Sequence, residues 1–98
     1  MSLRLIVRPE AEEDLREVHA YLQESRPGLA EWFRSELRGL FERIESRPEL
    51  YGRVWQDVRA ALLKKLPYVV YYVVFADHIE ILAVLHGSRD RTAWRSRL

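Results

Sequence analysis

Residues 68–75 read YVVYYVVF, the longest β-branched and aromatic run in a chain of 98 residues. A run without a polar face is typical of a strand that is covered on both sides of a sheet. Beyond a turn at residues 76–78, the pattern of residues 79–86 predicts an antiparallel return strand. Four of its apolar side chains alternate and are expected on one face: Ile79, Ile81, Ala83 and Leu85.

The stretch before the central run, residues 57–65, also alternates and predicts a third strand. If its set of Val58, Ala60 and Leu62 faces the helices, Arg59 faces the uncovered side of the sheet. His86 has the same parity as Glu80 and is expected on that open face too. Residues 50–56 predict a loop.

Two amphipathic helices precede the strands, at residues 10–24 and 29–47, and Pro48 ends the second. The acidic first turn after Pro9 fits a helix N-terminus. Residues 3–7 are β-prone. The order β-α-α-β-β-β predicts an α+β fold, with a helical hairpin packed on one face of a small, mainly antiparallel sheet.

Composition excludes several classes of protein. The length of 98 residues predicts one domain, residues 1–98, and the lack of cysteine excludes disulfides and thiolate zinc sites. No apolar run is long enough to cross a membrane, and no secretory signal is evident, so we expect a cytoplasmic protein. The net charge is +1, but residues 9–50 carry −5 and residues 51–98 carry +4. The basic half predicts docking on an acidic partner.

The search for chemistry yields one loose basic cluster. Arg59, Lys64, His86 and Arg89, with Lys65 and Trp94 nearby, supply the cations and the titrating group that a metal-independent ribonuclease needs. No carboxylate belongs clearly to this set, so a solvated basic face is the first interpretation and a catalytic face is the alternative. Neither a cofactor nor a metal site is predicted.

The remaining histidines and aromatic residues have structural interpretations. His19 is expected to be partly exposed on its helix, and His78 to be solvated at the hairpin turn. The tyrosines of the central run are expected to pack in the sheet, and Trp32 to be exposed.

Four stretches resemble the RelE/ParE superfamily of type II toxin–antitoxin toxins, and together they cover nearly the whole chain. They are Pro9-Glu10-Ala11-Glu12-Glu13-Asp14-Leu15; Arg47-Pro48-Glu49-Leu50-Tyr51-Gly52-Arg53; Val58-Arg59 with Leu66-Pro67-Tyr68-Val69-Val70-Tyr71-Tyr72; and Val84-Leu85-His86-Gly87-Ser88-Arg89-Asp90 with Trp94.

The resemblance implies one of two activities. RelE-like members cleave mRNA on the ribosome without a metal, whereas the named ParE-like members poison DNA gyrase. Two departures favour the ParE-like branch: Val69 follows Tyr68 where ribonucleases usually carry arginine, and Trp94 replaces a late tyrosine. The implied function is a plasmid-stabilisation type of toxin that inhibits growth by binding a protein, with gyrase as the expected target. The alternatives are a ribosome-dependent endonuclease and a non-toxic, antitoxin-binding relative.

The resemblance also implies a partner, a small DNA-binding antitoxin whose disordered C-terminal segment forms a hetero-oligomer with the toxin. It is expected to lie along the helical hairpin and a sheet edge, with contacts at Tyr21, Leu22 and Trp32. The expected target-binding residues lie in the tail: Arg89, Arg91, Trp94 and Arg95. Residues 89–98 carry four arginines against one aspartate, and this segment is expected to bury little and to serve the target more than the fold. In the alternative, Trp94 pins the tail to the sheet.

The first prediction is that the purified protein does not cut RNA, because Val69 and Trp94 occupy places where a cation and a phenol are expected. Ribosome-bound mRNA incubated with the protein should stay intact on a gel. Cleavage that disappears in Arg59→Ala or His86→Ala would overturn this interpretation.

Overall fold

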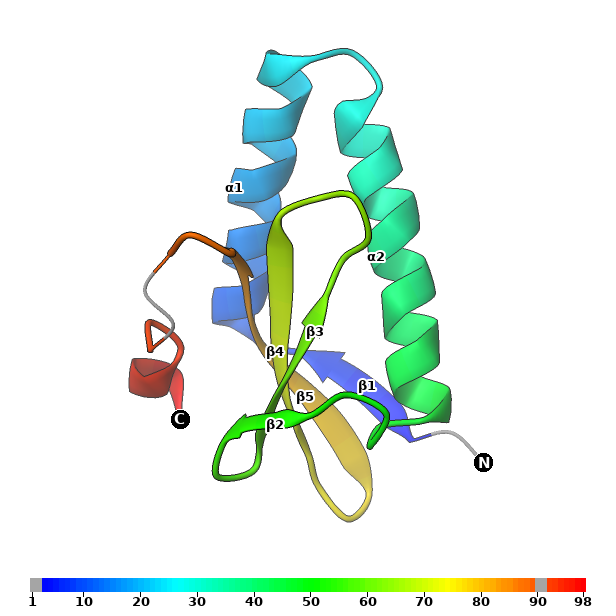
Figure 1. The fold of residues 1–98 in the computed structure, drawn as a ribbon, viewed down its shortest axis with the longest axis vertical. Helices are drawn as coiled ribbons and strands as arrows, with labels where there is room; N and C mark the ends of the chain where they lie inside the picture. Colours follow the sequence, from blue (N-terminus) through cyan, green and yellow to red (C-terminus); the bar gives the residue numbers. More distant parts are fainter. Residues whose placement is uncertain (1–2, 90–91) are drawn as a thin grey trace.

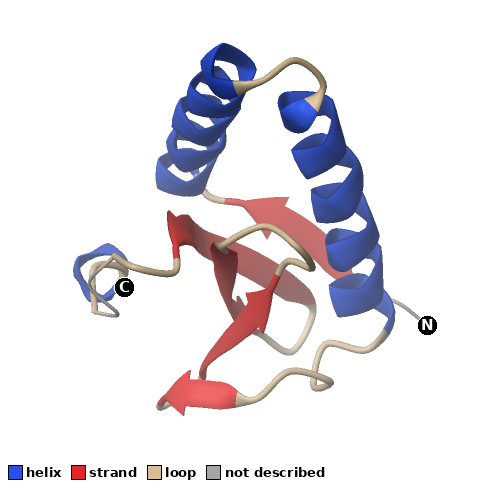
Figure 2. Cartoon of the chain, turned by 45° about the horizontal axis from the view of Figure 1, so that its top comes forward, coloured by secondary structure: helices blue, strands red, loops and turns tan. Residues whose placement is uncertain are grey.

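The computed structural model describes residues 3–89 and 92–98. Two helices cover one face of a five-stranded sheet, and the opposite face is left to the C-terminal tail (Figures 1 and 2). The elements are β1 (Arg4–Val7), α1 (Pro9–Ser25), α2 (Leu29–Ser46), β2 (Arg53–Trp55), β3 (Val58–Leu62), β4 (Tyr68–Val74), β5 (His78–His86) and a 3₁₀ turn, η1 (Arg95–Arg97).

The sheet order is β1-β5-β4-β3-β2, with β1 parallel to β5 and every other pair antiparallel. The α+β prediction is therefore confirmed. The expectation of a plain loop over residues 50–56 is wrong in part, because β2 adds a short edge strand. Three residues with an exposed valine at their centre carry too little alternation to be recognised as a strand.

The helical hairpin forms where the sequence predicts it. Pro9 begins α1, and Glu10 and Glu12 lie in its first turn, where the helix dipole favours negative charge. Between the helices, Gly28 has φ 85°, a left-handed conformation that glycine adopts without strain. The side of α2 that packs on the sheet buries Ala30, Phe33, Leu37, Leu40 and Ile44. Each of its larger side chains contributes roughly 1.5–3 kcal/mol by leaving water.

The face of β3 is the reverse of the expectation. Ala61 and Leu63 belong to the core under the helices, whereas Val58 and Ala60 pack with Trp94 on the other face. Arg59 consequently lies on the helix side, where its guanidinium donates to the Tyr51 carbonyl at 2.7 Å. Because β3 is apolar on both faces, alternation alone does not indicate which face the helices cover.

A bulge in β5 explains a second correction. Tyr71 pairs with Ala83 but Tyr72 pairs with Ile81, so Leu82 is an extra residue. Ile79 and Ile81 lie in the helix-side core, whereas Ala83 and Leu85 lie in the cluster on the opposite face. The inserted residue reverses the parity of everything after it, so the expectation that Ile79, Ile81, Ala83 and Leu85 share one face is wrong.

The bulge leaves backbone groups on the β5 edge beyond the reach of β1, whose last pair is Val7 with Ile81. Asp14 of α1 accepts the Val84 N–H at 3.0 Å, and Arg97 of the tail donates to the Leu82 carbonyl at 3.1 Å. Arg97 also binds both oxygens of Asp14, at 2.6 and 3.1 Å. The carboxylate is the first cause of the raised pKa of Arg97. Helix, sheet and tail therefore meet at one ion pair.

The C-terminal tail is anchored, and the expectation that it buries little is wrong. Trp94 is 1% exposed and packs against Tyr71, with ring centroids 5.6 Å apart. Arg8 of the β1–α1 junction donates to the Arg97 carbonyl. The alternative, in which Trp94 pins the tail to the sheet, is confirmed. Arg91 lies outside the described residues.

The second prediction is that Arg97→Ala lowers the free energy of unfolding by roughly 3 kcal/mol, because it leaves the buried Asp14 carboxylate without its counterion. Chemical denaturation measures the change. Arg89→Ala is the matched control: Arg89 is an exposed arginine of the same segment and should alter stability by less than ~0.5 kcal/mol. Equal losses in the two variants would contradict the assigned role of the ion pair.

Candidate functional site

His86 ends β5, and its ring orientation is fixed by the residues that follow. Its Nδ1 accepts the Ser88 N–H at 3.0 Å and lies 2.8 Å from the Ser88 hydroxyl. A backbone N–H only donates, so Nδ1 carries no hydrogen and the neutral ring bears its hydrogen on Nε2. The ring also makes an edge contact with Tyr68, at a centroid distance of 5.5 Å.

His86 lies on the helix side of the sheet, not on the open face. The bulge at Leu82 reverses its parity relative to Glu80, so the expectation that both share a face is wrong. A small cleft of about 150 Å³ brings His86 together with Arg89 and with residues of α1 and the sheet. Its other lining residues are Asp14, Glu17, Val18, Tyr21, Tyr68, Val84 and Leu85.

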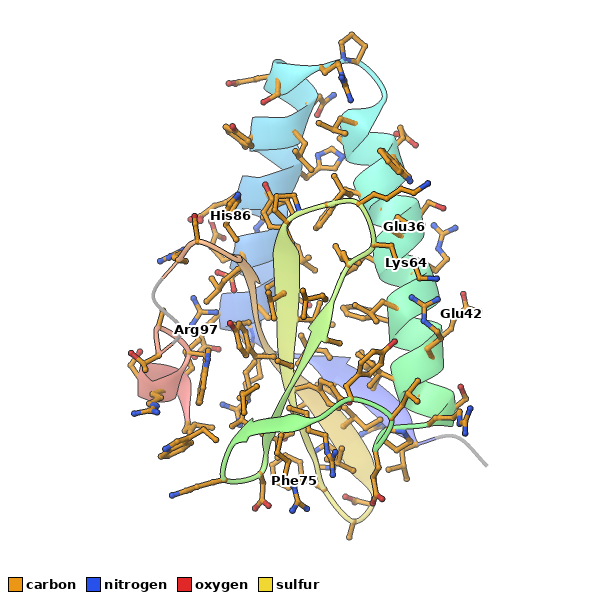
Figure 3. The ribbon with its side chains drawn as sticks, viewed as in Figure 1. Glu36, Glu42, Lys64, Phe75, His86 and Arg97 are labelled. Carbon is orange, nitrogen blue, oxygen red and sulfur yellow. The ribbon has the colours of Figure 1, made fainter. Side chains whose placement is uncertain are left out.

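The four catalytic candidates do not meet in one place. His86 and Arg89 share the small cleft, but Lys64 lies in the turn between β3 and β4, apart from His86 (Figure 3). Arg59 binds the carbonyls of the segment that follows α2. Beside it, burial raises the pKa of Tyr72 to about 12, and its hydroxyl donates to the Pro48 carbonyl at 2.7 Å. Both groups therefore hold the loop after α2 against the sheet.

His78 is held in a polar network at the far end of β5. Its ring nitrogens lie 2.8 Å from a Glu80 oxygen and 2.7 Å from an Asp77 oxygen, and hydrogen bonds to these carboxylates raise its pKa. The ring stacks on Phe75 at 4.8 Å, and Arg8 binds the same Glu80 at 2.6 Å. The side chain is 22% exposed, so the expectation of a solvated histidine is wrong. Its ring nitrogens are occupied by neighbouring side chains.

The helical hairpin presents two of its three predicted contact residues. Tyr21 is 65% exposed on α1 and Trp32 is 39% exposed on α2, as expected of Trp32. Leu22 is 3% exposed and belongs to the core, so it is not available for direct contact. Partly exposed His19 lies 3.3 Å from Arg34 at the rim of a cleft between the helices.

On the opposite face, the tail forms an aromatic and cationic cluster. Trp94 packs against Trp55 of β2, with ring centroids 5.7 Å apart. The guanidinium of Arg95 lies 4.7 Å from the Trp55 ring centroid and 5.6 Å from that of Trp94. Because Arg95 is exposed while Trp94 is buried, the tail offers a stacked cation above an apolar base.

The tail covers only part of this face. Beside it lies a hollow of about 480 Å³, here called the open-face hollow. It is lined by Val54, Ala60, Leu62, Val69, Tyr71, Gly87, Thr92, Trp94 and Arg95. Among residues 3–89 and 92–98, this lining includes no carboxylate, histidine or lysine, and its charged side chain is Arg95. Such a surface suits the binding of apolar groups better than acid–base chemistry.

The sequence did not predict that Val54 and Leu62 line a hollow. Its pattern assigned Val54 to a loop and Leu62 to the face under the helices. The pattern carries no signal for their exposure, because Leu62 stands between Ala61 and Leu63 and Val54 lies in a strand of only three residues. Within residues 3–89 and 92–98, no group of three or more acidic, histidine or cysteine side chains is placed to hold a metal ion. In the same part of the chain, no helix is both long and apolar enough to span a membrane.

Comparison with solved structures defines the class of fold. One chain of "Chromosomal ParDE TA system from P. aeruginosa" has a TM-score of 0.73 and 19% identity, covering 87% of this chain and 96% of that one. A chain of "The structure of YoeB dimer from Staphylococcus aureus" has a TM-score of 0.55 and 18% identity, covering 85% and 94%. At these identities the likeness establishes the fold alone.

The family follows from the sequence. Residues 5–91 match the family described as ParE toxin of type II toxin-antitoxin system, parDE. The chain therefore belongs to the ParE toxin family. Comparison with curated proteins finds no match.

Proposed function

We propose that this ParE-type toxin inhibits growth by binding a protein target, DNA gyrase, and that it is not a nuclease. The observation that carries the proposal is the open-face hollow. Among the described residues its lining is apolar except for Arg95 and Thr92, and the four candidate nuclease groups are divided among separate parts of the molecule. A metal-independent ribonuclease needs its base, cations and acid within reach of one phosphate.

The tail supplies the proposed target contacts. Arg89 and Arg95 are exposed, and Arg95 is already stacked on a tryptophan, which limits the entropy lost on binding. Trp94 acts from beneath, by holding Arg95 in place. Arg91 remains part of the proposal on the charge of the sequence alone.

A cognate antitoxin is the second proposed partner. We assign it to the helical hairpin, where Tyr21 and Trp32 are exposed aromatic side chains on neighbouring helices. Leu22 supports that surface from the core. A small DNA-binding antitoxin with a disordered, acidic and apolar C-terminal segment would bind there and form a toxin–antitoxin hetero-oligomer. We further propose that residues 1–98 form one domain that acts in the cytoplasm, and that the toxin–antitoxin pair is of the plasmid-stabilisation type.

A ribonuclease activity is the alternative, and one observation favours it. The small cleft joins His86 to Arg89 and Glu17, so it contains an imidazole, a cation and a carboxylate. The YoeB chain shares the fold. Against it, Arg59 is occupied by the Tyr51 carbonyl and Lys64 lies elsewhere. A non-toxic relative that keeps only antitoxin binding is the remaining alternative.

The third prediction tests the target. Induction of the protein in cells should stop growth and cause loss of DNA supercoiling before protein synthesis falls, because the proposed target is gyrase. Plasmid topology on chloroquine gels and pulse labelling of new protein measure the two effects. His86→Ala should be equally toxic. Early loss of protein synthesis that is relieved by His86→Ala would favour the ribonuclease instead.

The fourth prediction tests the antitoxin surface. Trp32→Ala should weaken the toxin–antitoxin complex by ~1–3 kcal/mol, the usual effect of removing an aromatic anchor. Calorimetric titration with the protein encoded by the adjacent gene measures it. Phe75→Ala removes a similarly exposed aromatic side chain far from the hairpin and should leave affinity unchanged. Equal affinity of wild type and Trp32→Ala would remove Trp32 from the interface.

A further inference from the structure

We propose that the open-face hollow is the docking site for the toxin's protein target, and that it takes an aliphatic or aromatic side chain adjoining a carboxylate. The inference rests on the proposed function and specifies the chemistry of the segment that the toxin recognises. It adds Val54 and Leu62 to the target contacts proposed above, all of which lie in the tail.

The rim of the hollow is apolar and solvent-exposed. Leu62 at the end of β3 is 69% exposed, and Val54 in β2 is 54% exposed. Both border the same hollow, although they come from separate strands. Isolated exposed aliphatic side chains need no explanation, but an exposed pair that adjoins an apolar hollow is typical of a protein interaction site.

Small lining residues leave room in the hollow for a side chain of the partner. Ala60 and Gly87 line it with little or no side chain, while the buried rings of Tyr71 and Trp94 form an aromatic wall. The volume of about 480 Å³ lies within the ~300–1,000 Å³ common for ligand pockets. The aromatic wall is already formed without the partner, because the ion pair between Arg97 and Asp14 anchors the segment that carries Trp94.

Arg95 defines the charge of the partner. Its guanidinium lies over the Trp55 ring, 4.7 Å from the ring centroid, and is exposed. No carboxylate of residues 3–89 or 92–98 lies within ion-pair distance of it. Stacking on an aromatic face leaves the in-plane N–H groups directed outward, in the fork that suits a carboxylate. An acidic residue beside an apolar one therefore complements the site.

Charge also argues against a second copy of this chain as the occupant. Arg95 lines the hollow, so a second copy seated there across a nearby two-fold axis would bring the two Arg95 side chains together, and like charges there are costly. The hairpin surface proposed for the antitoxin lies on the other side of the sheet (Figure 2). The hollow thus remains for the target, and the occupant is an acidic–apolar segment of that protein.

The experiment is titratable induction of full-length variants in cells without antitoxin, with growth inhibition as the readout. Leu62→Asp and Arg95→Glu should each raise the toxin level needed for half-maximal inhibition by about tenfold or more, as expected for loss of an anchor contact. Arg95→Lys should lose less than Arg95→Glu, because it keeps the charge. Immunoblots and thermal melts confirm equal amounts of folded protein.

Two control variants match these changes elsewhere. Leu50→Asp adds a charge to an exposed leucine in the loop after α2, and Arg38→Glu reverses an exposed arginine of α2. Both should inhibit growth like wild type. If Leu62→Asp is as toxic as wild type, the hollow is not the docking site. If Arg95→Glu is as toxic, the partner is not acidic at this point.

Three further outcomes are decisive. Wild-type protein that does not slow growth would overturn the proposed function, and the docking site with it. Variants that keep toxicity but lose binding to the adjacent gene's product would assign the hollow to the antitoxin and overturn the inference alone. A wild-type dimer that Leu62→Asp converts to monomer in sedimentation, with toxicity unchanged, would assign the hollow to self-association and likewise overturn it.

Discussion

The Asp14 carboxylate, 5% exposed, accepts the Val84 N–H of β5 and both arms of the Arg97 guanidinium. One side chain of α1 thereby fixes the helical layer, the strand edge beyond β1 and the tail. A buried carboxylate is stable only when its oxygens are paired and hydrogen-bonded. The bulge at Leu82 supplies the free backbone groups that this pairing uses, so the bulge, the ion pair and the anchored tail depend on one another.

That constraint determines which surface is available for function. With Arg97 fixed, Trp94 lies on Tyr71 and closes one part of the open face, and Arg95 is carried onto Trp55. Part of the same face stays uncovered and forms the open-face hollow, which Val54 of β2 and Leu62 of β3 border. The tail thus supplies Trp94 and the cation Arg95 to a hollow on an otherwise apolar face of the sheet. The helical hairpin, on the other side, remains free for a second partner (Figure 1).

Membership of the ParE family and the separation of the candidate nuclease residues both favour a protein-binding toxin over a ribonuclease. Metal-independent RNA cleavage requires several groups to act on one phosphate. Here Arg59 and Tyr72 instead hold the loop after α2, and His86 is oriented by Ser88 in a small cleft on the helix side. The same fold also occurs in a YoeB chain, which shows why fold by itself does not decide activity. The chemistry of the residues that line each surface decides between the proposals.

The sequence by itself determined the two helices, the three longer strands and their order, because apolar periodicity and the breaks at Pro9, Gly28 and Pro48 are local properties. It also placed Trp32 on the surface. Only the tertiary structure decided which face of β3 and β5 meets the helices. Both strands are apolar on two sides, and one inserted residue at Leu82 reverses parity without changing composition. The role of the tail was likewise undecided until Arg97 met Asp14, since a contact between residues 83 positions apart has no local signal.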